Sequence, residues 1–384
     1  MTTSFRHIET QLVHAGEPLP RILGAVEMPI FQSATFEYAG GGSYHDIRYL
    51  RINNTPSQLA LHGKIAVLEN AQAALVTASG MAAISTTLLA TLCAGDHLLA
   101  QSCLYGGTHD LVTSELPKLG ITCDFIDAQR RDSWEALLRP STRVIYVEAM
   151  TNPLLEVGDL EGVAQFARAH GLLSIIDNTL ATPVNFRPLD VGFDIAVHSA
   201  TKYLNGHSDI VAGALAGDAS TIERIRHKAN HLGGCLDPHA AFLLKRGLKT
   251  LALRVRFQND STLRIAQFLE AHPAVACVNY AGLESHPQHA RARRLFAGFG
   301  GLLSFELKGP PSRAEEFAQR VRIPTVAPSL GGVHTLLTRP AATSHAGLSR
   351  ADRERLGISE ALLRLSVGIE ATEDLLEDFR QALK

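Results

Sequence analysis

The sequence is poor in cysteine and in charge, and both shortages narrow the classes of protein it can belong to. Its 384 residues include five cysteines, an odd number with no Cys-x-x-Cys pair. Such spacing excludes a disulfide framework and a cysteine-based zinc site. Only 19% of residues are charged, and 36 basic side chains nearly balance 38 acidic ones. A chain this close to neutral lacks the electrostatic footprint of a nucleic-acid-binding protein.

The sequence also lacks an evident targeting or membrane segment. Its first residues, MTTSFRHIETQ, have no apolar core of the kind a signal peptide needs. The uncharged stretch from Asn70 to Gly95 is long enough to span a bilayer, but it contains several serines and threonines and a Ser79-Gly80 turn. We read it as a turn followed by a buried helix. We therefore predict a cytoplasmic protein with neither membrane nor nucleic acid as a partner.

From about residue 60, short apolar runs alternate with segments of helical periodicity. The strand-like runs are Ala73–Ala78, His97–Ala100, Thr122–Ile126, Val144–Val147, Leu172–Ile176, Ile195–His198 and Ile210–Ala216. The intervening amphipathic stretches include Asp132–Leu138 and Leu160–His170, the latter ended by Gly171. Continuous apolar strands separated by helices are typical of a mostly parallel sheet covered on both faces, so we predict an α/β fold.

The pattern divides the chain into three parts. Residues 1–55 show no sustained periodicity and read as an extended N-terminal arm. Residues 56–250 carry the strand-and-helix alternation, and residues 251–384 read as a smaller α+β domain that closes with the helix Glu373–Leu383. The basic run from Lys245 to Arg256 is expected to form a solvated or subunit-facing surface.

Three features follow predicted strands, at the sheet edge where open α/β folds bind ligands. Ser79-Gly80-Met81 opens a helix whose backbone N–H groups suit a phosphate. Asp177 ends an apolar strand, and Lys202 follows another strand. A desolvated lysine there has a lowered pKa and can form a Schiff base with an aldehyde. Taken singly, each feature also has a purely structural explanation. Ser79-Gly80-Met81 could be an ordinary strand–helix turn, Asp177 a capping aspartate, and Lys202 a surface lysine.

Together the three features match the needs of one cofactor, pyridoxal 5'-phosphate (PLP). PLP requires a lysine for its aldehyde, an acid beside its ring nitrogen and a dipole-rich cradle for its phosphate. A metal site is not expected, because His227 and His231 have a spacing that zinc uses but no evident third ligand. The Ser199-x-x-Lys202 spacing of serine acyl-hydrolases lacks the accompanying Ser-Asp-Asn and Lys-Thr-Gly motifs.

Longer motifs along nearly the whole chain resemble the Cys/Met-metabolism PLP-dependent family, which includes cystathionine lyases, cystathionine gamma-synthase, methionine gamma-lyase and homoserine-ester sulfhydrylases. The motifs are Pro29-Ile-Phe-Gln-Ser-Ala-Thr-Phe36, Ser79-Gly-Met-Ala-Ala-Ile84, Leu104-Tyr-Gly-Gly-Thr108, Thr151-Asn-Pro153, Asp177-Asn-Thr179, Ser199-Ala-Thr-Lys-Tyr203, Arg246-Gly-Leu-Lys-Thr-Leu251, Ser329-Leu-Gly-Gly332 and Leu363-Arg-Leu-Ser-Val-Gly368. The resemblance implies a fold-type I, aspartate-aminotransferase-like architecture.

The resemblance also implies roles for individual side chains around the cofactor. Lys202 would bind the aldehyde of PLP and then move protons. Asp177 would pair with the ring nitrogen, and Tyr105 would stack on the ring and act as acid or base. The phosphate would be held by the turn Ser79-Gly80-Met81, whose backbone N–H groups face it, and by the hydroxyls of Ser199 and Thr201.

Further roles concern the substrate and the neighbouring subunit. Asn152 would lie beside the 3-oxygen of PLP, and Arg364 would clamp the α-carboxylate of the substrate, with Ser329 nearby. Tyr49 and Arg51 match a Tyr-x-Arg motif that reaches the phosphate of the adjacent subunit. The resemblance therefore implies a homotetramer built from active dimers.

Two departures from the family pattern bear on the substrate. Asp110 stands where the cystathionine enzymes carry an arginine for the distal carboxylate, and His334 stands where they carry a glutamate. We expect γ-elimination from a γ-substituted 2-aminobutyrate whose distal group is neutral or cationic, canavanine being one example. The alternatives are elimination or replacement on cystathionine, methionine, homocysteine or an O-acylhomoserine, and a non-catalytic PLP-binding regulator.

Overall fold

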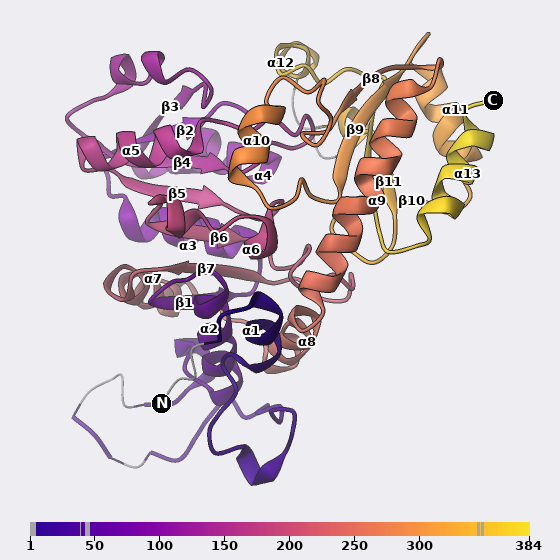
Figure 1. The fold of residues 1–384 in the computed structure, drawn as a ribbon. Coiled ribbons are helices and arrows are strands. Elements are labelled where there is room, and N and C mark those ends of the chain that lie inside the picture. Colours follow the sequence, from indigo (N-terminus) through magenta and orange to yellow (C-terminus); the bar gives the residue numbers. More distant parts are fainter. Residues whose placement is uncertain (1–4, 39, 43–46, 344–345, 347–348) are drawn as a thin grey trace.

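The computed structural model describes residues 5–38, 40–42, 47–343, 346 and 349–384, and it contains two sheets (Figure 1). The larger sheet has seven strands in the order β1-β7-β6-β5-β4-β2-β3. They are β1 (Ala73–Thr77), β2 (His97–Gln101), β3 (Thr122–Ile126), β4 (Thr142–Glu148), β5 (Leu173–Asp177), β6 (Ile195–His198) and β7 (Gly213–Gly217). Among these described strands, β7 is the one that runs antiparallel to its neighbours. The predicted mostly parallel sheet is therefore confirmed.

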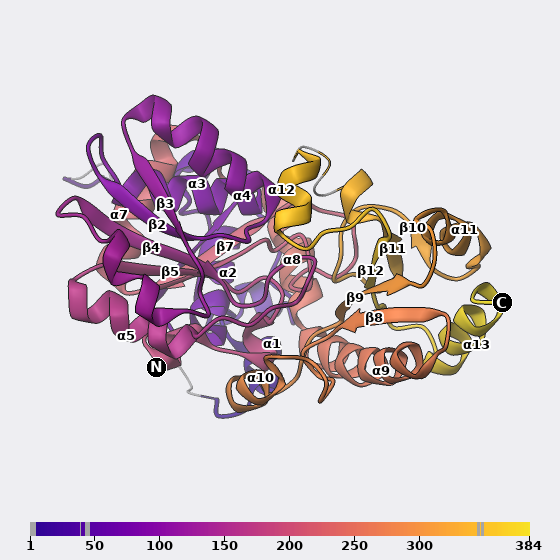
Figure 2. The same ribbon diagram turned by 90° about the horizontal axis from the view of Figure 1, so that it is seen from above.

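Helices cover both faces of this sheet, as the view from above shows (Figure 2). Helices α3 (Gly80–Thr91) and α7 (Ala219–Leu232) pack on one face through residues such as Ile84 and Ile225. Helices α2 (Pro56–Leu68) and α5 (Leu160–His170) pack on the other, where Ile65 and Val163 join a second core. Burial on both faces explains why the strands read as continuous apolar runs.

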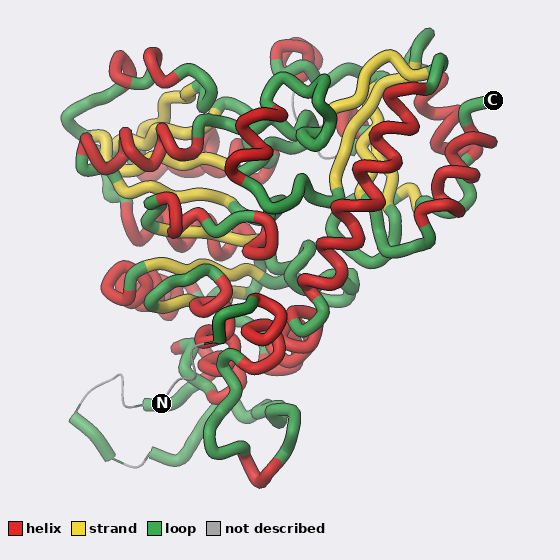
Figure 3. The backbone as a smooth tube through the Cα atoms, in the orientation of Figure 1, coloured by secondary structure: helices red, strands yellow, loops and turns green. Residues whose placement is uncertain are grey.

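The second sheet has five strands in the order β10-β11-β12-β9-β8, and helices lie along it (Figure 3). The strands are β8 (Val275–Asn279), β9 (Leu302–Leu307), β10 (Thr325–Val326), β11 (Leu336–Thr338) and β12 (Leu362–Ser366). Around them lie α9 (Leu251–Ala271), α11 (Ser312–Arg320) and α13 (Thr372–Ala382). A core centred on Phe305, Phe317 and Phe379 joins these helices to the sheet.

The remaining helices are short connectors or cover the sheet edges: α1 (Ile8–His14), α4 (Gly106–Asp110), α6 (Thr182–Asn185), α8 (Pro238–Leu248), α10 (His289–Leu295) and α12 (Arg350–Arg355). Within the described ranges, none of the helices combines the length and apolar character needed to cross a bilayer.

Three local predictions were wrong. The first 55 residues were expected to be extended, but they contain α1, whose last turn is held by the buried Lys64 ammonium on the Leu12 carbonyl oxygen at 2.7 Å. The stretch Asp132–Leu138 forms two 3₁₀ turns in place of a helix, with the Trp134 indole bonded to the Asp127 carbonyl oxygen at 2.7 Å. Helix α1 and the 3₁₀ turns are both held by contacts with residues outside the segment, which the periodicity of the local sequence does not show.

The basic run at Lys245–Arg256 also departs from its predicted surface role. Lys245 is buried and forms ion pairs with Glu17 and Glu27 of the N-terminal segment. Arg254 is buried on α9, and its Nη1 and Nη2 atoms donate to the carbonyl oxygens of Tyr203 and Gly247, each at 2.8 Å. This guanidinium therefore fixes the backbone immediately after Lys202 to the long helix α9.

We predict that Arg254→Ala lowers the free energy of unfolding by about 3 kcal/mol, because it leaves buried carbonyl groups without their charged donor. Urea titration followed by circular dichroism measures this change. Arg256→Ala is the matched control, since Arg256 is an exposed residue of the same helix whose ion pair with Glu9 lies at the surface. Its effect should stay within about 1 kcal/mol, and equal effects of the two variants would contradict the assigned role of Arg254.

Candidate functional site

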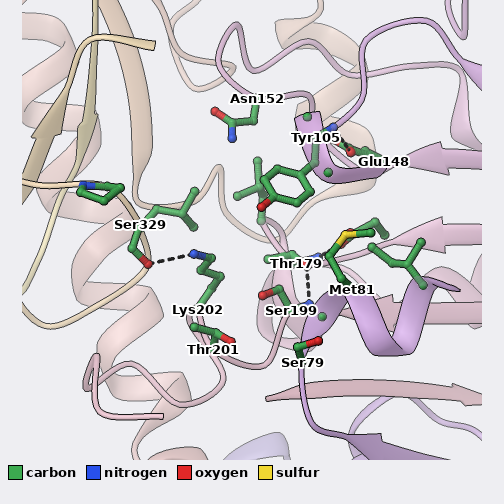
Figure 4. Close-up of a pocket in the computed structure, with 18 of the residues that line it drawn as sticks. Ser79, Met81, Tyr105, Glu148, Asn152, Thr179, Ser199, Thr201, Lys202 and Ser329 are labelled. Carbon is green, nitrogen blue, oxygen red and sulfur yellow. Dashed lines mark hydrogen bonds between the residues drawn. The ribbon is translucent and has the colours of Figure 1, made fainter. Parts of the chain in front are cut away.

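A cavity of about 790 Å³ lies where the carboxyl ends of the large-sheet strands face the second sheet (Figure 4). The segments that follow β1, β2, β4, β5 and β6 line it, which is where open α/β sheets bind ligands. Eleven of the fifteen predicted site residues line the cavity: Ser79, Gly80, Met81, Tyr105, Asn152, Asp177, Ser199, Thr201, Lys202, Ser329 and Arg364. The structure thus brings together residues spread over almost 300 positions of sequence.

Ser329 connects the two basic groups of the cavity. The Lys202 Nζ atom donates to the Ser329 hydroxyl oxygen at 2.8 Å, and Arg364 Nη2 donates to the Ser329 carbonyl oxygen at 2.8 Å. Ser329 has a φ of 90°, a left-handed conformation that is uncommon for a residue with a side chain. In this conformation the hydroxyl oxygen of Ser329 accepts from Lys202 and its carbonyl oxygen accepts from Arg364, so the amine and the guanidinium lie in the same part of the site.

Burial shifts the pKa of both cations. Burial and, to a smaller extent, the positive charge of Arg364 lower the pKa of Lys202 to about 8. Burial also lowers the pKa of Arg364 to about 10, so the guanidinium stays charged at neutral pH. Arg364 Nη1 donates to the Asn152 Oδ1 atom at 3.2 Å. The site therefore holds a fixed cation beside an amine that gives up its proton readily.

Two carboxylates line the opposite wall, at the ends of neighbouring strands. Glu148 ends β4 and is paired in register with Asp177 at the end of β5. One oxygen of Asp177 accepts the Thr179 backbone N–H at 2.9 Å, and Glu148 accepts the Tyr105 backbone N–H at 2.6 Å. Burial raises the pKa of both carboxyls, and the charge of Asp177 raises that of Glu148 further. A cationic ring nitrogen beside Asp177 would offset the cost of burying its charge.

The turn before α3 forms a cradle in which a side chain at Gly80 does not fit. A Cβ atom there would lie 2.8 Å from the Ser199 Cβ atom and 2.9 Å from the Ser199 hydroxyl oxygen. Ser79 caps the helix by accepting the Ala82 backbone N–H at 3.0 Å, and Thr201 bonds to the backbone of Ala212. This helix N-terminus with nearby hydroxyls suits a phosphate, so the donor set fits PLP.

Four predicted site residues do not line the cavity of their own chain. Tyr49 and Arg51 lie on the N-terminal segment, where Arg51 Nη1 donates to the Asn230 carbonyl oxygen at 2.8 Å. Asp110 is exposed and accepts the Ser114 hydroxyl at 2.8 Å, and His334 is exposed as well. Their proposed roles remain predictions.

Some cavity residues were assigned no role from the sequence. Glu148 was assigned no role, although it directly follows the predicted strand Val144–Val147, as Asp177 follows Leu172–Ile176. Thr179 accepts the Ser199 backbone N–H at 2.8 Å and so joins the segments after β5 and β6. Among the residues the structure describes, no group of three His, Cys, Asp or Glu side chains is placed to hold a metal ion.

We predict that the Lys202 amine of the protein without cofactor becomes reactive with a midpoint near pH 8, against about 10.4 for an ordinary lysine. The neutral amine is the nucleophile, and burial disfavours the charged form. Acetic anhydride labelling of Lys202, read by mass spectrometry across pH, measures this midpoint. Arg364→Met should move it to higher pH, and Arg256→Met should leave it unchanged. An unaltered midpoint in Arg364→Met would contradict the electrostatic coupling.

Comparison with known proteins agrees with this geometry. Residues 9–384 match the model of the family described as Cys/Met metabolism PLP-dependent enzyme. The chain is 41% identical to a cystathionine gamma-lyase of Bacillus subtilis (strain 168), over 98% of this chain and 99% of the relative, and 40% identical to a cystathionine beta-lyase of Coxiella burnetii, over 98% of each. A solved cystathionine gamma-lyase from Lactobacillus plantarum, complexed with L-serine, superimposes with a TM-score of 0.94 at 38% identity, covering 98% of both chains. The chain therefore belongs to the Cys/Met metabolism PLP-dependent enzymes and is a PLP-dependent carbon–heteroatom lyase or synthase.

Proposed function

We propose that the protein catalyses γ-elimination from a γ-substituted 2-aminobutyrate, giving a 2-oxoacid and ammonia. The observation that carries this proposal is the placement of the Lys202 amine and the Arg364 guanidinium on one residue, Ser329, inside the cavity. A lyase of this kind needs a base at Cα and a fixed receptor for the α-carboxylate. The similarity to a cystathionine gamma-lyase at 41% identity supports the assignment.

PLP, when bound, supplies an electron sink that makes the Cα–H bond of an amino acid acidic. Asp177, Tyr105 and Asn152 would hold its ring, and the turn Ser79-Gly80-Met81 with the hydroxyls of Ser199 and Thr201 would hold its phosphate. The other tasks fall to the side chains that face the substrate.

Arg364 binds and orients the α-carboxylate of the substrate through its two-pronged donor geometry. The Lys202 amine takes the proton from Cα and must return that proton before it takes one from Cβ, after which the leaving group departs from Cγ with the electrons of its bond. Ser329 orients the amine by accepting a hydrogen bond from it. A pKa near 8 suits a base that must accept and return protons near neutral pH.

The distal group of the substrate is proposed to be neutral or cationic. The charged residues that line the cavity are Glu148, Asp177, Lys202 and Arg364. Arg364 is the single guanidinium in this set, and it is assigned to the α-carboxylate. A distal carboxylate would therefore meet no second arginine of the same chain. Because Asp110 does not line the cavity and bonds to Ser114, this argument depends on the composition of the wall and not on a contact with Asp110.

We predict that canavanine or methionine is turned over with a higher kcat/KM than cystathionine, and that the oxoacid released has the four-carbon chain expected of γ-cleavage. One preparation is assayed with canavanine, methionine, O-succinylhomoserine and cystathionine, with and without a thiol. Lys202→Ala is the inactive control.

Efficient cleavage of cystathionine with no turnover of canavanine or methionine would overturn the proposed distal specificity. Pyruvate as the product from cystathionine would instead assign β-elimination. Product formation only in the presence of the thiol would assign replacement, and no turnover of any substrate would favour a PLP-binding regulator.

We further propose that residues 1–55 complete the cavity of a neighbouring subunit in a homotetramer of active dimers. Tyr49 and Arg51 lie outside the cavity of their own chain, and Arg51 stacks over the Tyr49 ring with its Cζ atom 5.7 Å from the ring centroid. The pair thus presents a cation and an aromatic ring on the N-terminal segment.

Mixing two inactive variants tests this arrangement. Subunits with Lys202→Ala and subunits with Arg51→Ala, each inactive alone, should regain activity after joint refolding or exchange, because a mixed dimer contains one site with both residues intact. Activity is measured against the unmixed variants. Lys202→Ala mixed with Arg364→Ala is the control, and it should stay inactive because both residues belong to the same site. Failure of the first mixture to recover activity would contradict the shared site.

A further inference from the structure

A buried polar cluster lies directly behind the cavity, between α2 and the large sheet. Glu69 caps the carboxyl end of α2, and its side chain is fully buried. Its Oε1 atom lies 2.5 Å from the His198 Nε2 atom and accepts the Asn178 Nδ2 donor at 3.2 Å. His198 and Asn178 are equally buried. None of these three side chains lines the cavity.

This cluster has an electrostatic balance of its own. A carboxylate removed from water is costly unless a cation and hydrogen bonds compensate it. The His198 imidazole provides the ion-pair contact of Glu69 among the described residues. The second oxygen of Glu69 and the Nδ1 atom of His198 have no partner among those residues. The described contacts of the buried Glu69 carboxyl are therefore the His198 imidazole and the Asn178 amide, both on its Oε1 atom.

The cluster is also joined to the proposed cofactor residues through the backbone. Asn178 follows Asp177, and His198 precedes Ser199. The Asn178 backbone N–H donates to the Val197 carbonyl oxygen at 2.9 Å, and Val197 is the register partner of Asp177. Glu69 thus ties together the ends of β5 and β6, the two strands that carry Asp177 and lead to Lys202. A positive charge on His198 lowers the pKa of Asp177, opposing the effect of burial.

We propose that Glu69 is a positioning residue for the cofactor: by bonding to both His198 and Asn178 it fixes the ends of β5 and β6, and so places the Asp177 carboxylate for the ring nitrogen of PLP. The inference rests on the proposed role of Asp177 and is independent of which substrate the enzyme uses. Glu69 contacts neither cofactor nor substrate and acts only through His198 and Asn178.

The test measures the affinity of the protein for PLP, not its activity. Apo protein is titrated with PLP and the bound cofactor is followed at ~420 nm, where a protein-bound Schiff base absorbs. Glu69→Gln keeps the shape and an acceptor oxygen but removes the charge. We expect it to raise the Kd for PLP on the order of tenfold, because a neutral amide oxygen accepts more weakly than a carboxylate from the His198 and Asn178 side chains that it must hold. His198→Gln should act in the same direction.

A double-mutant cycle separates this role from a purely structural one. In an Asp177→Asn background the carboxylate that Glu69 positions is already absent, so Glu69→Gln should cause little further loss of PLP affinity. His97→Gln is the matched control. His97 is a fully buried histidine of the same sheet, paired with Asp124 at 3.3 Å, and it lies at the opposite end of its strand from the cavity. This control should leave the Kd for PLP unchanged.

Each outcome decides the matter. Unaltered PLP affinity in a folded Glu69→Gln or His198→Gln protein overturns the inference, and so does a full additional loss in the Asp177→Asn background. If Asp177→Asn alone binds PLP as tightly as the wild type, the assignment of Asp177 fails and this inference fails with it. If Glu69→Gln does not fold, as judged by circular dichroism, His198→Gln takes its place in the same cycle.

Discussion

The hydrogen bond from Lys202 to Ser329 joins the two sheets at the point where the chemistry is expected. Lys202 follows β6 of the large sheet, and Ser329 precedes β11 of the second sheet. Arg364 on β12 repeats the connection by bonding to Asn152, which follows β4. The placement of Lys202, the proposed base, relative to Arg364, the proposed receptor for the α-carboxylate, therefore depends on how the two sheets pack. Arg254, which ties α9 to the backbone after Lys202, contributes to the same constraint.

The charges of the cavity are few, and each is set by its surroundings. Desolvation alone disfavours all four ionised groups, lowering the pKa of the cations and raising that of the carboxyls. The cationic ring nitrogen of PLP would offer Asp177 a partner of opposite charge, and the α-carboxylate of a substrate would offer one to Arg364. The helix N-terminus at Gly80 adds a dipole that needs no titratable group.

The sequence predicted the strands well because strands buried on both faces leave an unbroken apolar signal. Thr122–Ile126 and Ile195–His198 agree residue by residue with the structure. Most of the residues predicted to hold the cofactor line one cavity, because they stand at strand ends and in contiguous motifs. Helix α1 and the burial of Lys245 were missed because both depend on contacts distant in sequence. The same limit applies to Glu69 and His198, which are 129 residues apart and share no periodicity. Neither Asp110 nor His334 lines the cavity. The sequence could not show this, because a position on a helix or in a loop does not by itself fix the direction of a side chain.

The lining of the cavity has a polar part, which holds the residues proposed for the reaction, and an apolar part. The groups that handle protons and carboxylate are polar and interlocked through Ser329, so a change at one displaces another. The remaining lining includes apolar side chains, among them Met81, Ile84, Met150, Val211 and Leu330, and the structure records no hydrogen bond from any of these side chains to the polar set. Substitutions in that wall are expected to alter the shape and polarity of the cavity without removing a hydrogen bond of Lys202 or Arg364. Under the proposed function, the leaving group would be selected by this apolar surface, while elimination would use Lys202 and Arg364. This separation accounts for one architecture serving relatives named as gamma-lyase, beta-lyase and gamma-synthase.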